Sequence, residues 1–446
     1  MICMQKQVYM VSLGCAKNLV DSEVMLGLLD QAGYGVALLP ESADLLLVNT
    51  CGFIGSAVEE AIDEILVLAE YKKADPHKKL VVTGCLVQRY AGDLQKELPE
   101  VDLFIGTDGF KDIVKLLADE DGDSRLCWTP DSSFLMDSSL PRKLSTPAHR
   151  AYLKITEGCN NRCSYCLIPS IRGRLRSRPL ADLLQETSRL AVSGLKELTL
   201  VAQDLLAYGT DLGNSTDLQK LLSALLAGTS IPWLRLLYLH PARLAPDFLG
   251  FMADNPRIVP YLDIPVQHVS DRILKRMNRP YGRAHLERLL AQVREILPAA
   301  AIRTTLMVGF PGETITEVEE LVDFLGSHRF DHLGVFTYAD EEGCRAQALS
   351  GHCPEEEKEA RRARIMELQA AISLEKQQAY VGRIEKVLIE GISRESDLLL
   401  EGRTKFQAPE IDGCVYITSG TTNQGEIVDV RITEAHHYDL VGELAT

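Results

Sequence analysis

Two series of short apolar runs, each alternating with helix-like stretches, constrain the fold of this chain more than any other feature. Alternating strands and helices are typical of parallel sheets, in which the crossover helices cover the faces. We therefore expect an α/β protein of several domains. The runs of the first series are residues 8–13, 45–48 and 80–82. Those of the second are residues 152–155, 197–201, 234–239, 261–264, 302–308 and 332–336.

The breaks between these series predict the domain organisation. Residues 1–125 are expected to form a domain with a parallel α/β sheet, and residues 126–150, rich in Ser, Pro and Asp, a linker. Residues 151–375 are expected to form a complete or partial barrel of strands and helices, and residues 355–380 read as a charged connecting helix. Residues 376–446 hold short alternating runs punctuated by glycines, which predicts a small β-barrel.

Composition and charge narrow the class of protein. A hydrophobic content of 46% with 25% charged residues is typical of a globular chain. The apolar run that ends at Gly14 is too brief for a signal peptide or a membrane span, so we expect a cytoplasmic protein with no membrane partner. The net charge of -16 argues against general coating of nucleic acid, although a local basic patch remains compatible with it.

Cysteines are the strongest chemical signal. Eleven of them in an intracellular chain indicate metal or cluster ligation rather than disulfides. Cys159, Cys163 and Cys166 lie within eight positions, in the loop after a predicted strand. A four-iron cluster ordinarily takes four cysteines, so a compact set of three leaves one iron open to a substrate or cofactor. The alternative is a structural zinc site, which needs a fourth ligand that the neighbouring sequence does not offer.

Three further cysteines share another position in the predicted secondary structure. Cys15, Cys51 and Cys85 each stand where a predicted strand gives way to a loop and a helix, with a glycine beside them. Because the carboxyl ends of parallel strands form the ligand crevice, the three thiols are expected to converge there and hold a second cluster. Buried core thiols are the alternative. Incidental or buried thiols are the expectation for the remaining cysteines, Cys3, Cys127, Cys344, Cys353 and Cys414.

An arginine run and three strand ends are weaker signals. Arg172, Arg174, Arg176 and Arg178 would face one way on an extended segment and could engage phosphates, but pairing with nearby carboxylates or solvation is the commoner fate, so RNA contact is not expected. Polar residues also lie at strand ends, where barrel enzymes bind ligands. They occupy residues 201–204, 265–268 and 308–313 and receive no chemical role, so no catalytic residue is assigned beyond the cluster ligands.

The spacing Cys159-x3-Cys163-x2-Cys166, with Tyr165 before the last cysteine, resembles the signature of the radical S-adenosylmethionine superfamily. The resemblance implies a partial (β/α)6 barrel. It also implies that these three cysteines hold a cluster whose open iron binds S-adenosylmethionine. An electron passed to this cofactor then releases a 5′-deoxyadenosyl radical, which can abstract hydrogen from an unactivated carbon.

Over its whole length the chain resembles the radical SAM methylthiotransferase family, whose small C-terminal barrel is of the TRAM type. The runs SLGCAKNLVDSE at residues 12–23 and APEIDG at residues 408–413 are similar to the RimO branch, although Ala16 stands where proline is usual. This implies two four-iron clusters and insertion of a methylthio group at the β-carbon of an aspartate in the twelfth protein of the small ribosomal subunit. One alternative is a MiaB-like tRNA (N6-isopentenyladenosine) methylthiotransferase, and another is a non-catalytic iron–sulfur electron-transfer protein.

The expected partners follow from this resemblance and from charge. They are a basic ribosomal protein as substrate and a reducing protein as electron donor, while the sulfur source stays open. Residues 382–446 hold twelve acidic and six basic residues, and 12 minus 6 leaves six net negative charges. Such a surface attracts a protein rich in lysine and arginine and repels a phosphate backbone. Solubility alone is the alternative reason for this acidity.

Overall fold

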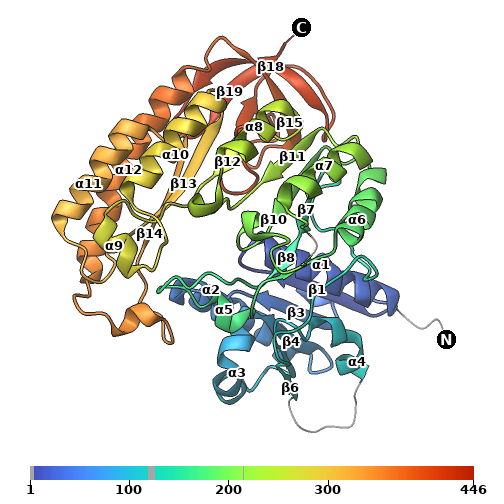
Figure 1. Cartoon of the computed structure of the whole chain (residues 1–446). Coiled ribbons are helices and arrows are strands. Elements are labelled where there is room, and N and C mark those ends of the chain that lie inside the picture. The colour runs from blue at the N-terminus through green and yellow to red at the C-terminus, as the bar shows by residue number, and fades with distance from the viewer. Residues whose placement is uncertain (1–4, 119–125, 214, 446) are drawn as a thin grey trace. The chain divides into compact units, whose positions relative to one another are not determined.

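The computed structural model describes residues 5–118, 126–213 and 215–445 (Figure 1). The chain divides into two compact units, and the loop from residue 159 to 166 contributes to both. Unit 1 comprises Met1–Ser145, Lys154–Asn161 and Cys166–Gln185, and unit 2 comprises Thr146–Leu153, Arg162–Tyr165 and Glu186–Thr446. No helix of the described ranges is long and apolar enough to cross a bilayer.

Unit 1 is built on a six-stranded sheet in the order β2-β1-β3-β4-β5-β6, with every neighbouring pair parallel. All six residues of the central strand β3 are buried, as expected for a parallel strand covered on both faces. The predicted parallel α/β domain is confirmed. The strands are β1 Gln7–Ser12, β2 Gly35–Val36, β3 Leu45–Thr50, β4 Lys79–Gly84, β5 Leu103–Ile105 and β6 Leu126–Trp128. The α-helices among them are α1 Ala16–Gln31, α2 Gly55–Ala74, α3 Cys85–Glu97 and α4 Ile113–Ala118.

The segment predicted as a linker, residues 126–150, is partly integrated into unit 1. Its first residues form β6, which pairs with β5. Further along, the Arg142 guanidinium lies 2.6 Å from the Glu23 carboxylate on α1, and the Ser145 N–H donates to the other oxygen of that carboxylate at 2.9 Å. Glu23 is fully buried, so this carboxylate fastens the segment to α1. The domain boundaries themselves stay predictions.

Unit 2 contains the second strand series in two three-stranded sheets, β11-β10-β7 and β12-β13-β14. A parallel bridge from Leu234 of β11 to Ile258, just before β12, joins the two sheets. The six strands match the six predicted runs, so the partial barrel is confirmed. The strands are β7 Arg150–Lys154, β10 Glu197–Val201, β11 Trp233–Leu236, β12 Tyr261–Asp263, β13 Ala301–Val308 and β14 His332–Thr337. Among the helices that alternate with these strands are α6 Leu180–Val192, α7 Leu218–Gly228, α8 Pro246–Asp254, α9 Asp271–Arg276, α10 Arg283–Ile296 and α11 Ile315–His328.

The charged helix predicted near the end of this series is α12, Glu355–Gln378, and it leads into a closed barrel in the order β15-β16-β17-β19-β18. On β18, buried Val430 and Ile432 alternate with exposed Asp429, Arg431 and Thr433, because successive residues of a strand face opposite sides. The predicted small β-barrel is confirmed. Its strands are β15 Ile384–Ile392, β16 Leu400–Thr404, β17 Val415–Ile417, β18 Ile427–Ala435 and β19 Leu440–Leu444.

A buried charge cluster fastens this barrel to the parallel strands of unit 2. Glu197 on β10 is fully buried and contacts Arg235 on β11. Its other carboxylate oxygen lies 2.6 Å from the Arg403 guanidinium on β16. Burial raises the pKa of Glu197, but the two guanidinium groups outweigh burial and hold this pKa below its usual range. The carboxylate is therefore charged and compensates two buried cations.

Replacing Glu197 with glutamine tests this cluster. We expect Glu197→Gln to lower the free energy of unfolding by about 3–5 kcal/mol, because the buried Arg235 loses its counter-charge and Arg403 keeps only that of Glu390. Urea unfolding followed by circular dichroism measures the change. The matched control is Glu434→Gln on the exposed face of β18, which should change stability by less than about 0.5 kcal/mol. Equal stability of the two variants would contradict the role of Glu197.

Candidate functional site

Cys15, Cys51 and Cys85 stand at the carboxyl ends of three neighbouring strands of unit 1. Cys15 caps α1 just after β1, Cys51 directly follows β3, and Cys85 begins α3 after β4. Since β1, β3 and β4 are adjacent and parallel, these ends share one edge of the sheet, as the sequence predicted. All three are free thiols, with Cys15 exposed, Cys51 half-buried and Cys85 buried. Their role as cluster ligands stays a prediction.

Glycines allow the three cysteine loops to pack against one another. A Cβ atom on Gly14 would lie 2.9 Å from the Cβ of Cys51. A Cβ atom on Gly52 would lie 2.6 Å from the backbone nitrogen of Leu86 and 2.8 Å from the carbonyl carbon of Cys85. Side chains at these two positions would push the loops apart. A glycine therefore lies beside each cysteine for a steric reason: the backbones approach too closely to leave room for a side chain.

Asn18, on the first turn of α1, ties two of these loops together. Its side-chain N–H groups donate to the carbonyl of Leu13 at 2.7 Å and to that of Thr50 at 3.3 Å. The backbone carbonyl of Asn18 accepts a hydrogen bond from the side chain of Asn49 at 2.9 Å, and both asparagines are buried. Sequence reasoning gave neither residue a role. The available signal was an amide in the first turn of a helix that begins at a candidate ligand.

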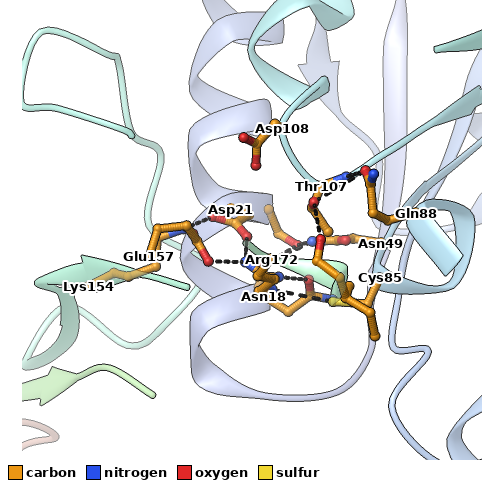
Figure 2. A network of polar contacts seen from close by, with 12 residues as sticks. Asn18, Asp21, Asn49, Cys85, Gln88, Thr107, Asp108, Lys154, Glu157 and Arg172 are labelled. Carbon is orange, nitrogen blue, oxygen red and sulfur yellow. Dashed lines mark hydrogen bonds and ion pairs between the residues drawn. The ribbon is translucent and has the colours of Figure 1, made fainter. Parts of the chain in front are cut away.

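Arg172 lies at the centre of a buried polar network in unit 1 (Figure 2). Its guanidinium donates four hydrogen bonds and its side chain is only 2% exposed. The partners are Cys85 Sγ at 3.3 Å, Asn18 Oδ1 at 3.1 Å, Asp21 Oδ2 at 3.0 Å and Glu157 Oε1 at 3.0 Å. One side chain thus contacts a candidate ligand, the amide that ties the loops, and two carboxylates.

Lys154 completes the charge balance of this network. Its ammonium lies 2.7 Å from Glu157 Oε2 and also contacts Asp21. Burial opposes ionisation of Glu157, but Lys154 and Arg172 outweigh it and hold the pKa of Glu157 well below its usual range. Two cations and two carboxylates are therefore buried together, an arrangement that avoids an uncompensated charge in the interior.

The three N-terminal thiols differ in acidity. Burial raises the pKa of Cys85 to about 11, although Arg172 opposes the shift. Burial also raises the pKa of Cys51. Desolvation acts in the same direction on the Cys15 thiol, although the residue as a whole is exposed, but the charges of Lys17 and Arg172 outweigh it and lower the pKa of that thiol. Metal ligation requires the thiolate form, so binding a cation here must release protons.

The second cysteine set occupies the irregular loop between β8, Thr156–Glu157, and α5, Ile168–Ile171. In the part that belongs to unit 1, the Cys159 N–H donates to the Gly173 carbonyl at 3.1 Å and the Cys159 sulfur accepts from the Asn161 N–H at 3.4 Å. In the part that belongs to unit 2, the Cys163 sulfur accepts from the Arg279 guanidinium at 3.4 Å. Cys159, Cys163 and Cys166 are half-buried free thiols.

Both sets suit an iron–sulfur cluster in their donor chemistry. They supply free thiols, the ligands of such clusters, and hydrogen-bond donors already directed at sulfur. Across the part of the chain that the structure describes, no group of three or more His, Cys, Asp or Glu residues is arranged to hold a single metal ion. Cysteines of a four-iron cluster bind different irons and need not meet at one point.

The arginine run is not an exposed strip. Arg172 is buried in the network, and Arg178 is buried beside Asp182, with a nitrogen–oxygen distance of 2.7 Å. Arg176 donates to three backbone carbonyl groups of unit 1 and lies 3.7 Å from the Asp108 carboxylate, and Arg174 is exposed. The extended conformation that would align the four side chains is broken at residue 173, a glycine with a φ of +73°. Pairing with nearby carboxylates, the alternative that the sequence left open, is confirmed for Arg172, Arg176 and Arg178.

Two residues that follow the carboxyl end of β12 have structural partners. His268 is fully buried, and its Nδ1 accepts hydrogen bonds from the backbone N–H groups of Val269 and Ser270, both at 2.9 Å. Gln267 pairs with β13 through its backbone, where its N–H donates to the Thr305 carbonyl at 2.8 Å. These contacts favour a loop-capping role for His268 and a backbone-pairing role for Gln267.

The cysteines outside the two sets show no common location. Cys344 is buried, whereas Cys127, Cys353 and Cys414 are half-buried. Cys127 lies on β6 of unit 1, and Cys414 lies just before β17 in the barrel. Cys3 lies outside the described residues.

Family models match three segments of the chain. The uncharacterized protein family UPF0004 matches residues 7–106, the Radical SAM superfamily residues 153–325 and the TRAM domain residues 381–445. Together with the fold, these matches define the class of this protein as a radical SAM enzyme with an N-terminal cysteine-bearing sheet domain and a C-terminal TRAM barrel. Membership of the Radical SAM superfamily implies a four-iron cluster and S-adenosylmethionine.

Curated relatives narrow the class to one family. A protein of Desulfotalea psychrophila called ribosomal protein uS12 methylthiotransferase RimO is 55% identical over 97% of this chain and 98% of its own length. The protein of the same name from Pelobacter propionicus is 47% identical over 99% of this chain and 98% of its own length. The chain belongs to the RimO family of radical SAM methylthiotransferases.

A solved structure supports the fold alone. The radical S-adenosylmethionine methyltransferase TsrM from Kitasatospora setae, with a tryptophan substrate and an analogue of S-adenosylmethionine bound, has a TM-score of 0.53 and 18% identity. The match covers 74% of this chain and 72% of TsrM. At this identity the likeness concerns the arrangement of strands and helices and not the substrate.

A methyl group at Gly52 tests the packing of the cysteine loops. We expect Gly52→Ala to lower the free energy of unfolding by about 1–3 kcal/mol, because the new Cβ meets backbone atoms of Cys85 and Leu86 that cannot rotate away. The matched control is Gly92→Ala on α3, where nothing lies within 4 Å of the added Cβ, and it should leave stability equal or raise it by up to about 1 kcal/mol. Urea unfolding of both cluster-free proteins distinguishes them, and equal stability would contradict the close packing.

Proposed function

We propose that this chain inserts a methylthio group at the β-carbon of an aspartate in ribosomal protein uS12, the protein that the names of its relatives specify. The observation that carries the proposal is the second cysteine set at one sheet edge, in addition to the radical SAM loop. Radical formation alone needs one set of three cysteines. Sulfur transfer gives a reason for the second.

The proposed ligands divide between the two sets. Cys159, Cys163 and Cys166 would hold one four-iron cluster with S-adenosylmethionine, and Cys15, Cys51 and Cys85 would hold the other. When bound, these groups supply the 5′-deoxyadenosyl radical and the methylthio sulfur.

The chain itself contributes position and hydrogen bonds. Asn18 holds the first two N-terminal cysteine loops together, and Arg172 holds the sulfur of Cys85. Arg279 donates to the sulfur of Cys163. These donors are buried, so they are oriented before any cofactor binds and need little reorganisation during the reaction. Their role is to orient ligands rather than to move protons.

Replacing Cys15, Cys51 and Cys85 together by alanine tests the two-cluster assignment. We expect iron to fall from about eight to about four atoms per chain, because one of two four-iron clusters is lost. The variant should still form 5′-deoxyadenosine but fail to modify uS12. Iron analysis, chromatography of the nucleoside and mass spectrometry of the ribosomal protein measure the three outcomes. Cys353→Ala, outside both sets, is the control and should keep about eight irons. Unchanged iron in the triple variant would refute the second cluster.

The barrel surface favours a basic protein over an RNA as substrate. Seven acidic side chains are exposed there against four basic ones, and 7 minus 4 leaves three net negative charges. Other acidic residues of the barrel are engaged internally, such as Glu390 with Arg403 and Asp412 with Tyr261. The exposed residues are Glu395, Asp397, Glu410, Glu426, Asp429, Glu434 and Glu443, with Arg383, Lys386, Arg394 and Arg431. Residual negative charge of this kind attracts lysine and arginine and repels phosphates.

Neutralising part of this surface tests the substrate class. Deleting the barrel is unsuitable because it removes Arg403 from the buried carboxylate of Glu197. We expect a variant with Glu395→Gln, Asp397→Asn, Glu434→Gln and Glu443→Gln to bind purified uS12 about tenfold more weakly at low salt and to lose much of the salt dependence. Titration at two salt concentrations measures both effects.

The matched control removes four exposed acidic charges from α2 of unit 1 through Glu59→Gln, Glu60→Gln, Asp63→Asn and Glu70→Gln. It should bind uS12 as the unaltered protein does. Equal loss of affinity in both variants would show that only total charge matters. Tighter binding of tRNA than of uS12 by the unaltered protein would favour the MiaB-like alternative.

A further inference from the structure

Arg172 belongs to the radical SAM segment by sequence, yet one of its hydrogen bonds goes to a cysteine of the other set. Its Nε lies 3.3 Å from the sulfur of Cys85 (Figure 2). Its Nη1 lies 3.0 Å from Glu157, two positions before Cys159. Within unit 1, a single buried guanidinium therefore links residues of both cysteine-bearing segments.

The local backbone forces this arrangement. β8 pairs in antiparallel fashion with β9, Arg176–Ser177, so the chain folds back along itself after the cysteine loop. Gly158 has a φ of +71°, and a Cβ atom on it would lie 2.2 Å from the Arg174 carbonyl oxygen. Only glycine allows the two segments to approach so closely. The turn brings Arg172 and Glu157 together before any cofactor is present.

The charge on Arg172 is permanent and buried. Guanidinium does not lose its proton in proteins, so its charge persists at every physiological pH. Asp21, Glu157 and Lys154 complete the set of two cations and two carboxylates. Hydrogen bonds to cluster sulfur and nearby net charge are among the main determinants of a cluster's reduction potential. In a buried environment these effects are stronger than in water.

We propose that Arg172 is a positioning residue of the N-terminal iron–sulfur centre, which holds the Cys85 sulfur and raises the reduction potential of the cluster bound there. The proposal rests on the assignment of Cys15, Cys51 and Cys85 as ligands. Glu157 acts in the opposite direction, because its carboxylate offsets part of the guanidinium charge. The same guanidinium also fixes the segment that leads into Cys159 against the N-terminal cysteine loops.

The experiment isolates the N-terminal cluster. A parent protein carrying Cys159→Ala, Cys163→Ala and Cys166→Ala is reconstituted with iron and sulfide, and its potential is measured by a redox titration followed by electron paramagnetic resonance. We expect Arg172→Met to shift the potential downward, because a positive charge and a hydrogen bond to sulfur are lost. Arg172→Lys should restore part of the shift. Glu157→Gln should shift the potential upward, because a negative charge is lost.

Arg174→Met is the matched control, since this arginine of the same run is exposed to water and its loss should leave the potential unchanged. Equal potentials in the parent, Arg172→Met and Glu157→Gln proteins would overturn the inference. If Arg172→Met does not fold, the Glu157→Gln protein alone tests the inference, and an unchanged potential in that protein would overturn it. Absence of iron from the parent would instead refute the ligand assignment, so the two failures are distinguishable.

Discussion

Parallel pairing of β1, β3 and β4 is the constraint on which the candidate site of unit 1 depends. Three residues at positions 15, 51 and 85 are far apart in sequence, and only the shared direction of their strands brings them to one edge. Small residues and buried amides then determine how the loops at this edge pack against one another. Gly52 lets two loops touch, and the Asn18 side chain donates a hydrogen bond to one backbone carbonyl of each of two loops.

Buried arginine–carboxylate groups recur in both units, although each costs desolvation energy. In unit 1 the group around Arg172 contacts a candidate ligand, and in unit 2 the group around Glu197 joins the barrel to parallel strands. Apolar residues of the same volume would pack as stably in many proteins. Ion pairs also fix the orientation of the segments, because a planar guanidinium group can donate its hydrogen bonds in only a few arrangements of its partners. Both groups lie where segments distant in sequence must meet in one geometry.

Sequence patterns predicted the fold well where periodicity or spacing carries information. Six apolar runs became the six strands of the partial barrel, and the glycine-punctuated tail became a closed barrel. Patterns failed where an outcome depends on tertiary contacts. Residues 126–150 have linker composition, but Glu23 on α1 holds part of them in place. The spacing of the arginine run predicts an extended segment, whereas a turn at residue 173 leaves Arg172 in a buried network. No local signal distinguishes such an arginine from its exposed neighbour Arg174.

The attachment of the barrel has a consequence for how this family diversifies. A carboxylate at position 197 and a guanidinium at position 403 are 206 residues apart, yet they pair in one buried cluster, in which Glu197 also pairs with Arg235 and Arg403 with Glu390. A recombinant whose barrel lacks a cation at position 403 would therefore break this cluster, because Glu197 would lose one of its two buried counter-charges. The barrel is consequently inherited together with the part of the parallel-strand sheet to which this cluster fastens it. Independent exchange of the barrel as a cassette is open only to relatives that share this pair.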